Sequence, residues 1–514
     1  MSCDTCIVGA GAAGIYLATR LVASGQSVVL IEAGGKRASD GSVVGFKCEF
    51  DIEPYHGATT GRLFGVGGTT AAWGGALMPF TDLDCGLLDN QDIWSHVVMT
   101  VGRRSRAVLS ALRYPHDGEF SSAASVRLGA AFHALSGSGI DTLSALWLPF
   151  HFKNFSFLLA QDFKRPGRLR VVFGGVANAW EFTSSPAEES RVVGVSAVAQ
   201  NGKLLTLNGT NFVLAAGAIE SARILLEMND NAGGDVVRRT SAVGQYLSDH
   251  LSLPIADVAP ESLEISRQAG YTPFFLNGWM RNPRFFDASA SSDSPRAFAH
   301  FIASDRGAGF HLARAALSAF QSRSLPKLTA VQLAAGLGGL LRLGWARYAR
   351  SELFVPHGTP MHLQLDIEQK PVASNRITLA TNRDRYGRRN ANISWRIHDH
   401  DLTSIRLAAR RMLERWPNHA EGVPRLIPRV LEATADKPYD TYHPTGTCRM
   451  GVDAAAVVNL DLSVWGTQNL WLLSTGVFPS SGTANPTFSL LCFAEELSEH
   501  LLVLKSRTVD SSRL

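Results

Sequence analysis

The first 32 residues combine apolar runs with one glycine-rich turn. An apolar run at 5–8 predicts a strand, apolar residues recur at helical spacing over 15–22, and a second run at 27–31 predicts another strand. The segment 9–14, G-A-G-A-A-G, lies between the first strand and the helix. This order of strand, glycine turn, helix and strand is typical of a dinucleotide-binding unit.

Further along the chain, apolar runs predict strands at 169–172, 192–199 and 204–207. A fourth run at 211–217 ends in Ala-Ala-Gly and precedes a predicted helix over 218–226. These elements fit the completion of the dinucleotide-binding domain that begins at residue 1, so we expect that domain to be discontinuous.

The pattern changes between about 256 and 439. Strands are predicted at 361–368 and 376–380, and an amphipathic helix over 402–416. In 361–368 the odd positions are apolar and the even positions polar, which predicts a strand with one polar face. We expect that face to be solvated, with a cavity as the alternative; Glu368 is expected to be structural, with a second acid/base role as the alternative.

Near the carboxyl end, Pro486 begins a predicted helix with Asn485 as its cap, and apolar residues recur at helical spacing over 490–501. The positive end of this helix points at whatever precedes Asn485. His398 to Asp401, H-D-H-D, resembles a metal cluster but directly precedes a predicted helix, so we interpret it as a cap.

The segment 305–350 is apolar and basic. Its one acidic residue, Asp305, is accompanied by seven Lys and Arg side chains. Such a segment could rest on a membrane surface, dock a partner or cover an active site, and two packed helices with extended arginines fit equally well.

Composition narrows the class of protein. The chain has 514 residues, with 49 basic and 45 acidic side chains and a formal charge of +4, which disfavours a nucleic-acid partner. Six cysteines in this length do not indicate a disulfide scaffold, and Cys3-x-x-Cys6 is interpreted as reduced thiols. We find no signal sequence or membrane-spanning run and therefore expect a cytoplasmic protein.

The glycine turn indicates how a dinucleotide would bind. Gly9 permits the turn, Gly11 lets backbone approach a pyrophosphate, Gly14 lets helix and strand pack, and Glu32 ends the second strand where an acid holds a ribose hydroxyl. The unit does not separate FAD from NAD. The run at 61–75, G-R-L-F-G-V-G-G-T-T-A-A-W-G-G, has six glycines in fifteen positions, as backbone pressed against a large flat ligand would require.

Six motifs in order resemble the glucose-methanol-choline (GMC) family of FAD-dependent oxidoreductases. They are the glycine turn with Glu32, G-G-T-T-A-A-W-G-G, A-A-G-A-I-E-S-A-R at 215–223, G-Q-Y-L-S-D-H, H-P-T-G-T-C-R-M-G, and A-N-P-T before the last helix. The resemblance covers nearly the whole chain. It implies an α/β fold in which a Rossmann-type FAD-binding domain is interleaved with a substrate-binding domain built on an antiparallel sheet with helices.

On this resemblance, residues 1–85, 165–255 and 440–514 form the FAD-binding domain. Residues 86–164 and 256–439 form the substrate-binding domain, with a cap segment near 305–350. The resemblance further implies catalytic roles for His443 and Asn485. The residues expected to bind the cofactor are Gly9, Gly11, Ala12, Gly14, Glu32, Ala33, Gly67, Gly68, Thr69, Trp73, Gly74, Val176, Ala216, Gly217, Gly476, Asn485, Pro486 and Thr487.

The implied reaction is oxidation of an alcohol CH–OH group to a carbonyl by hydride transfer to the flavin, with His443 as general base. Imidazole, with an ordinary pKa near 6.5, suits proton acceptance near neutrality. Asn485 can hydrogen-bond the substrate oxygen but cannot act as a base. Two alternatives are a lyase of the same fold that uses His443 only for acid/base chemistry, and a flavin-bearing subunit that passes electrons to a protein.

Three departures from the family pattern matter. Members with covalent FAD carry histidine where this chain has Ala72, so we expect non-covalent FAD. Many members have an acidic residue in the strand before V-F-P-S-S-G, where this chain has Leu472 to Gly476. Residues 86–160 follow no family pattern, which leaves the substrate specificity open. The sequence also leaves open the electron acceptor (oxygen, a quinone or a protein) and the oligomeric state.

Overall fold

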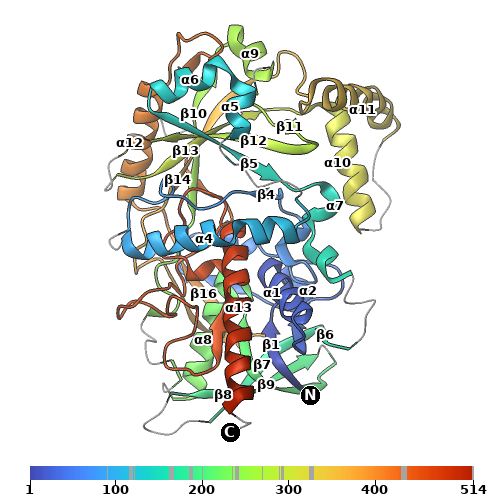
Figure 1. Ribbon diagram of the computed structural model, residues 1–514, viewed down its shortest axis with the longest axis vertical. Helices are drawn as coiled ribbons and strands as arrows, with labels where there is room; N and C mark the ends of the chain where they lie inside the picture. Colours follow the sequence, from blue (N-terminus) through green and yellow to red (C-terminus); the bar gives the residue numbers. More distant parts are fainter. Residues whose placement is uncertain are drawn as a thin grey trace.

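A computed structural model describes residues 1–88, 91–114, 120, 122–160, 167–183, 189–199, 201–233, 236–237, 242–268, 270–288, 290, 294–322, 329–429 and 437–511. The molecule is elongated, with one sheet in each half (Figure 1). Both chain ends lie in the half that holds the strands β1, β7, β8 and β9. The helix α4 (Gln91–Ala111) crosses the middle of the molecule.

The first half contains a seven-stranded sheet with the order β6-β2-β1-β9-β8-β7, and β19 pairs with β9. Its strands are β1 (Ser2–Val8), β2 (Val28–Glu32), β6 (Leu169–Phe173), β7 (Gly175–Thr183), β8 (Arg191–Ala199), β9 (Leu204–Leu214) and β19 (Leu470–Leu472). The pairs β1–β2, β1–β9, β2–β6 and β9–β19 are parallel, so their carboxyl ends share one edge.

Two sequence predictions differ from this sheet. The strands predicted at 204–207 and 211–217 form one strand, because Asn208 and Gly209 stay paired with Ser2 and Cys3 of β1. The strand β7 was not predicted. Hydrogen bonding to neighbouring strands determines where these strands begin and end, and the local pattern of polar residues does not reveal that pairing.

The second half contains a nine-stranded antiparallel sheet with the order β17-β10-β14-β13-β12-β5-β4, to which β11 and β18 add. The central strands are β10 (His250–Val258), β14 (Met361–Glu368), β13 (Ala297–Ala303), β12 (Trp279–Asp287) and β5 (Ile140–Trp147). The shorter strands are β4 (Ala76–Leu77), β11 (Phe274–Leu276), β17 (Leu426–Pro428) and β18 (Tyr439–Asp440).

The polar face of β14 is buried, so the expectation of a solvated face is wrong. Gln364, Asp366 and Glu368 are 2%, 6% and 1% exposed. The carboxylate of Glu368 accepts the backbone N–H groups of Gly86 and Arg296 at 2.7 and 3.0 Å, which fits its expected structural role. Alternating apolar and polar residues predict that one face of a strand is polar, but they do not predict whether other segments cover that face.

The sheets depart from the predicted domain limits in three places. β4 and most of β10 lie within the segments 1–85 and 165–255, yet both strands belong to the nine-stranded sheet. A third sheet joins β15 (Arg376–Arg383) and β16 (Arg389–Ser394) to β3 (Cys48–Phe50), far from both in sequence. The domain assignment as a whole stays a prediction.

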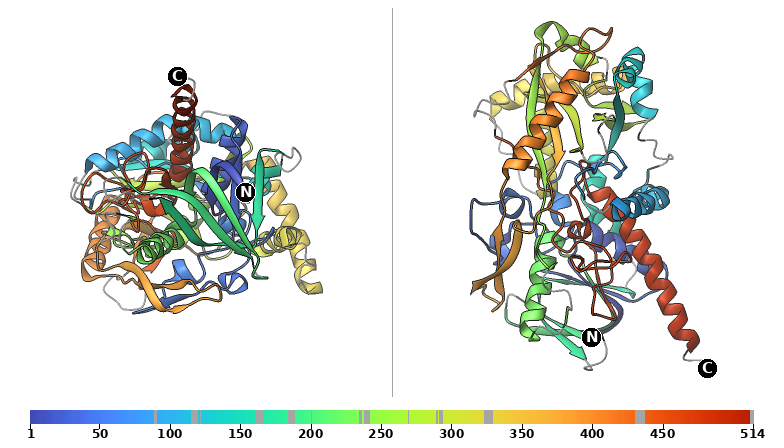
Figure 2. Two further views of the ribbon diagram at one scale, coloured as in Figure 1. Left: turned by 90° about the horizontal axis from the view of Figure 1, so that it is seen from below. Right: turned by 90° about the vertical axis from the view of Figure 1, so that its left-hand side faces the viewer.

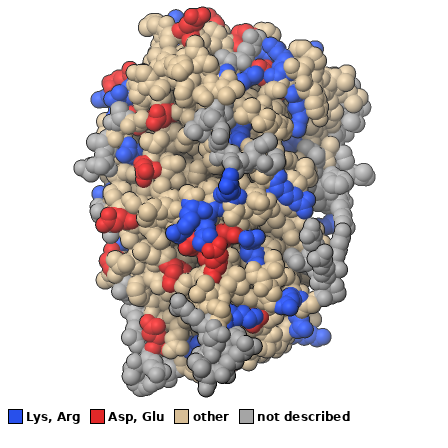
Figure 3. All heavy atoms as spheres, viewed as in Figure 1, with Lys and Arg blue, Asp and Glu red and all other residues tan. Residues whose placement is uncertain are grey.

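Helices connect the two halves. α1 (Ala12–Ala23) and α4 both contact the last helix, α13 (Thr487–Ser511). Adjoining blue and red side chains mark the crossing of α4 and α13 in Figure 3, where Arg104 pairs with Glu496 and Glu499 at 2.5 and 2.6 Å. The remaining long helices are α8 (Gly217–Asn231), α12 (Asp399–Arg415), α10 (Gly307–Ser322) and α11 (Ala330–Arg350).

The predicted cap at His398 to Asp401 is confirmed. The carboxylate of Asp401 accepts the backbone N–H of His398 at 2.9 Å, at the start of α12. The described part of the chain holds no group of three or more His, Cys, Asp or Glu that could bind a metal. Nor does any described helix have the length and apolar character needed to cross a membrane.

Candidate active site

A cavity of about 720 Å³ opens where β1, β2, β9 and β19 end. Fifteen of the residues predicted for the site line it: Gly9, Gly11, Ala12, Glu32, Ala33, Gly68, Thr69, Trp73, Gly74, Ala216, Gly217, His443, Asn485, Pro486 and Thr487. Parallel strands place their carboxyl ends at one edge, which is why residues so far apart in sequence meet here.

The three glycines of the first turn have different surroundings. A Cβ on Gly9, whose φ is +108°, would lie 2.4 Å from the carbonyl oxygen of Ala215, and one on Gly14 would lie 2.0 Å from that of Gly9. A Cβ on Gly11 would meet no protein atom within 4 Å. Gly9 and Gly14 are therefore required by packing, whereas Gly11 presents bare backbone to the cavity.

Glu32 lies at the end of β2, and its carboxylate is held by backbone. It accepts N–H groups of Ala10, Gly34 and Gly65, each at 2.8 Å. Burial raises the pKa of this carboxyl, and the three donors oppose that effect. Because two carboxylate oxygens offer about four acceptor directions, one remains for a hydroxyl of a ligand.

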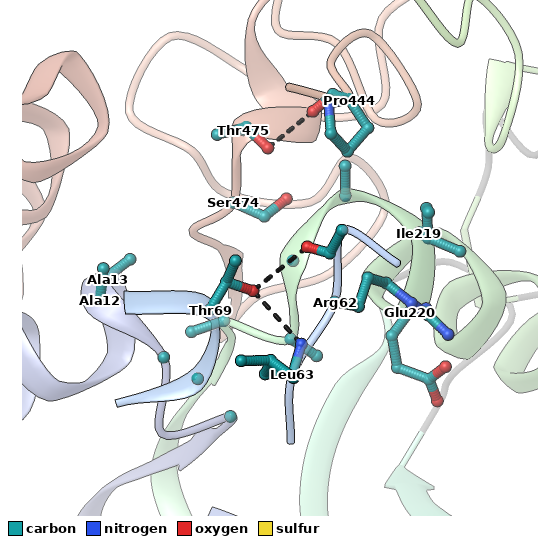
Figure 4. A pocket seen from close by; sticks show the side chains of 18 of the residues that line it. Ala12, Ala13, Arg62, Leu63, Thr69, Ile219, Glu220, Pro444, Ser474 and Thr475 are labelled. Atoms are coloured by element: carbon teal, nitrogen blue, oxygen red, sulfur yellow. Dashed lines mark hydrogen bonds between the residues drawn. The ribbon is translucent and has the colours of Figure 1, made fainter. Parts of the chain in front are cut away.

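The glycine-rich loop forms one wall of the cavity. Gly67 and Gly68 have φ values of +92° and +51°, and 68–71 forms a short 3-10 helix. The Thr69 hydroxyl lies 3.5 Å from the carbonyl oxygen of Gly61 (Figure 4). The Trp73 indole N–H donates to the carbonyl of Lys153 at 2.8 Å. The loop is thus ordered by its own contacts, and Ala72 also faces the cavity.

Four residues predicted to bind the cofactor do not line the cavity: Gly14, Gly67, Val176 and Gly476. Gly14 packs against Gly9, Val176 is fully buried in β7, and a Cβ on Gly476 would lie 2.5 Å from the Thr447 hydroxyl oxygen. A motif locates a segment at a site, but packing decides which of its residues face the ligand.

His443 and Asn485 meet at the cavity wall. The Asn485 amide Nδ2 lies 3.2 Å from His443 Nε2, and His443 Nδ1 lies 3.0 Å from the Thr441 hydroxyl oxygen. Because an amide nitrogen only donates, Nε2 carries the lone pair and the ring proton resides on Nδ1. The Thr441 hydroxyl then donates to Asp249 Oδ1 at 3.3 Å.

Burial governs the protonation of His443. It lowers the pKa of the imidazole to about 3, and the neighbouring His250 adds to that effect. The two imidazole rings lie 4.9 Å apart, and His250 Nε2 is fixed 2.7 Å from the carbonyl oxygen of Ser481. His443 is therefore a neutral imidazole near pH 7.

The carboxylate of Asp249 holds the His443 and His250 segments in place. Burial raises its pKa to about 7, and it accepts a hydrogen bond from the Tyr55 hydroxyl. Its oxygens also accept the backbone N–H groups of His443 and His250. Asp249 is not among the site residues predicted from the sequence, although the G-Q-Y-L-S-D-H motif that contains it was the available signal.

A buried polar row extends from His250 along one face of the nine-stranded sheet. In the register of the sheet His250 is paired with Glu368, and Ser252 with Asp366. Burial raises the pKa of Asp366, but the His300 imidazole 3.1 Å away and a hydrogen bond from the Ser252 hydroxyl lower it to about 2. Next to it, burial lowers the pKa of Arg284 to about 10, and its Nε and Nη1 have no hydrogen-bond partner among the described residues.

An ionic network that the sequence analysis missed lies on another side of the cavity. Arg62 and Glu220 stand opposite Ala12 and Ala13 in Figure 4. The Glu220 carboxylate pairs with Arg388 at 3.1 Å and with Arg223 at 2.9 Å. Burial opposes ionisation of Glu220, but these cations lower its pKa. Arg62, Glu220 and Arg388 all line the cavity, so this wall is polar.

Residues 371–494 match the family model described as GMC oxidoreductase. The chain is 36% identical over 99 residues to pyridoxine 4-oxidase of Microbacterium luteolum, covering 17% of this chain and 19% of that protein. It is 23% identical over 313 residues to 2-methyl-1,2-propanediol dehydrogenase of Mycolicibacterium austroafricanum, covering 59% and 50%. The chain thus carries a GMC oxidoreductase domain at residues 371–494. The aligned regions span half or less of these curated GMC relatives.

Solved structures show the same fold. The crystal structure of pyridoxine 4-oxidase from "Mesorbium loti" matches with a TM-score of 0.56 and 15% identity, over 97% of this chain and 99% of the other. A variant of Aspergillus oryzae formate oxidase, described in terms of FAD modification, matches with the same TM-score and identity over 98% and 99%. The chain therefore has the two-part α/β architecture predicted.

GMC oxidoreductases bind FAD, and the cavity fits that cofactor. Gly11 exposes backbone at the amino end of α1, Glu32 has an acceptor direction to spare, and the glycine-rich loop leaves room along one wall. The amino end of α13, at Pro486 and Thr487, also faces the cavity. Neither α10 nor α11 contributes a described residue to the lining, so the expectation of a cap over the site finds no support in the cavity wall.

Proposed function

We propose that this chain oxidises an alcohol CH–OH group to a carbonyl, with FAD as the cofactor and His443 as the general base. The observation that carries the proposal is the neutral imidazole at the cavity wall, whose Nε2 lone pair lies 3.2 Å from the Asn485 amide. The names of the relatives add support, since each of them refers to an alcohol or to a compound that bears hydroxyl groups.

In this proposal the cofactor is held at several points of the cavity. Gly11 and the amino end of α1 receive the pyrophosphate, Glu32 accepts a ribose hydroxyl, and the loop at 61–75 covers the ring system. When bound, FAD supplies the acceptor for the electrons released from the alcohol carbon. Ala72 offers no imidazole for attachment, and therefore we propose that binding is non-covalent.

The protein residues handle the proton. When the substrate binds, the Asn485 amide transfers its hydrogen bond from His443 Nε2 to the substrate oxygen and holds that oxygen in place. The lone pair of Nε2 is then free to accept the proton of the substrate hydroxyl. The imidazolium that results keeps its Nδ1–H on Thr441, and Thr441 donates to Asp249. The Asp249 carboxylate, when ionised, stabilises the positive charge on the ring through this hydroxyl.

A screen of alcohols under anaerobic conditions tests the proposal. Pyridoxine, 2-methyl-1,2-propanediol, sugars, polyols and apolar alcohols would each be mixed with the FAD-loaded protein while the visible absorbance of the flavin is followed. A substrate bleaches the flavin and yields one carbonyl product per flavin. If no alcohol bleaches it and carbonyl adducts are cleaved instead, the chain is a lyase and the proposal is wrong.

The electron acceptor follows from the same experiment. After bleaching, the absorbance is followed on addition of oxygen, of a soluble quinone or of a cytochrome. Rapid recovery with oxygen identifies an oxidase, whereas recovery only with the quinone or the cytochrome identifies a dehydrogenase.

A further inference from the structure

The helices α10 and α11 form a hairpin at the edge of the second half of the molecule. They project from the body next to β11 in Figure 1 and stand away from it in Figure 2. Glycines let the two helices approach closely: a Cβ on Gly339 would lie 2.4 Å from the backbone nitrogen of Gly309. The inner side of α11 is therefore packed, with Ala346 only 3% exposed.

The outer side of α11 is apolar and open to solvent. Leu337, Leu341, Trp345 and Tyr348 are 60%, 78%, 60% and 84% exposed. Their spacing of four, four and three residues places them on one face of the helix. We call these four residues the α11 stripe. A contiguous stripe of large apolar side chains is unusual on the surface of a protein and marks an interaction site.

Positive charge accompanies the stripe. The sequence has no Asp or Glu from 306 to 351, while Arg342, Arg347 and Arg350 lie within α11 itself. The guanidinium of Arg350 lies 5.5 Å from the ring centre of Trp345, and that of Arg347 lies 5.6 Å from that of Tyr348. Arg342 has no ion-pair partner among the described residues. A surface of this kind attracts a partner that is both apolar and anionic.

We propose that the α11 stripe docks on the surface of an anionic lipid bilayer. Leucine side chains reach the boundary of the acyl chains, Trp and Tyr favour the level of the head groups, and the arginines meet lipid phosphates. The carboxylate next to the stripe, that of Glu352, is buried and pairs with Arg127 and Arg350, so α11 presents no exposed acidic side chain of its own to an anionic membrane. The stripe also lies on a projecting helix, where a flat surface can reach it.

Vesicle flotation with the full-length, FAD-loaded protein tests this inference. One set of vesicles contains phosphatidylcholine alone, and the other contains added phosphatidylglycerol. The wild-type protein should float with the anionic vesicles at low salt, remain behind with the neutral ones, and be released by high salt. The double variant Leu341→Ser/Trp345→Ser should float at least tenfold less, and Arg342→Glu should bind anionic vesicles several-fold more weakly.

Leu204→Ser serves as the matched control, because Leu204 is 64% exposed at the start of β9, in the other half of the molecule. It should float as the wild type does. Flavin content and thermal unfolding temperature should be unchanged in every variant, which shows that the fold is intact. The proposal is wrong if the wild type ignores anionic vesicles, or if the double variant floats as well as the wild type. It is equally wrong if the stripe holds two copies of the chain together, so that the double variant turns a dimer into a monomer while lipid binding is absent.

Discussion

The backbone N–H of His443 lies 3.0 Å from both carboxylate oxygens of Asp249. The same carboxylate accepts the N–H of His250 and the hydroxyl of Tyr55, so one buried group orients two histidines and anchors the segment before α3 (His56–Thr59). The position of the proposed base is thus fixed through its main chain, while its imidazole remains free to face the cavity.

Replacement of His443 by alanine should slow flavin reduction by roughly a hundredfold or more, as expected on loss of a general base. Stopped-flow absorbance under anaerobic conditions measures this rate directly. His357→Ala is the control, since the side chain of His357 is 82% exposed. A rate for His443→Ala close to that of the wild type would remove His443 from the mechanism.

Replacement of Asn485 by aspartate should give the reaction a new pH dependence. A carboxylate near His443 Nε2 favours the imidazolium and therefore raises the pKa of His443 from its value of about 3. In the wild type the rate of flavin reduction should be insensitive to this group between about pH 5 and 7. In Asn485→Asp the rate should fall as the pH decreases through the raised pKa, and an unchanged pH profile would contradict the assigned contact.

Replacement of Gly11 by valine should give a folded protein without flavin. A Cβ at this cavity-lining position meets no protein atom within 4 Å, and the φ of −79° suits any residue. Gly14→Val should instead fail to fold, because its Cβ would lie 2.0 Å from a carbonyl oxygen. Gly102→Val, on the exposed side of α4, is the control and should retain FAD. Circular dichroism and flavin absorbance distinguish the three outcomes.

Glu368 should make stability depend on pH. Burial raises its folded pKa to about 7 from an ordinary value of 4.5. The folded state then binds more protons between these values, so the free energy of unfolding falls as the pH rises through them. The difference amounts to about 3 kcal/mol. Glu368→Gln cannot ionise and should lose this pH dependence in urea unfolding, whereas exchange of the exposed Glu414 for glutamine should preserve it.

Acid or heat precipitation should release all of the flavin into the supernatant, because Ala72 occupies the cavity wall where a histidine would be needed for attachment. Absorbance of the supernatant and of the washed pellet measures the division. Yellow colour that remains in the pellet would show a covalent bond at another residue.

Local motifs predicted the cofactor side of the molecule well. The turn at 9–14, the strand that ends at Glu32 and the helix after Pro486 all lie where the sequence placed them, because each depends on glycine, proline or apolar spacing within a short segment. The cytoplasmic location and the domain limits stay predictions.

The remaining features depend on contacts between distant segments, which a single sequence does not display. Tyr55, Asp249 and Thr441 become one hydrogen-bonded group only in the folded chain. The burial of Asp366 likewise depends on what packs over its strand. Arg284 shows the same limit, since nothing in its local sequence indicates a buried cation.

The short strand β19 has a consequence for truncated chains. It pairs with β9, the neighbour of β1 in the sheet, although it is formed by Leu470–Leu472, far from both in sequence. The cavity also takes its lining from both ends of the chain, from Val8 to Leu490. A chain that stops before Leu470 lacks β19 and the lining residues Leu473 to Leu490, so such a truncated product cannot complete the cofactor site and should stay colourless.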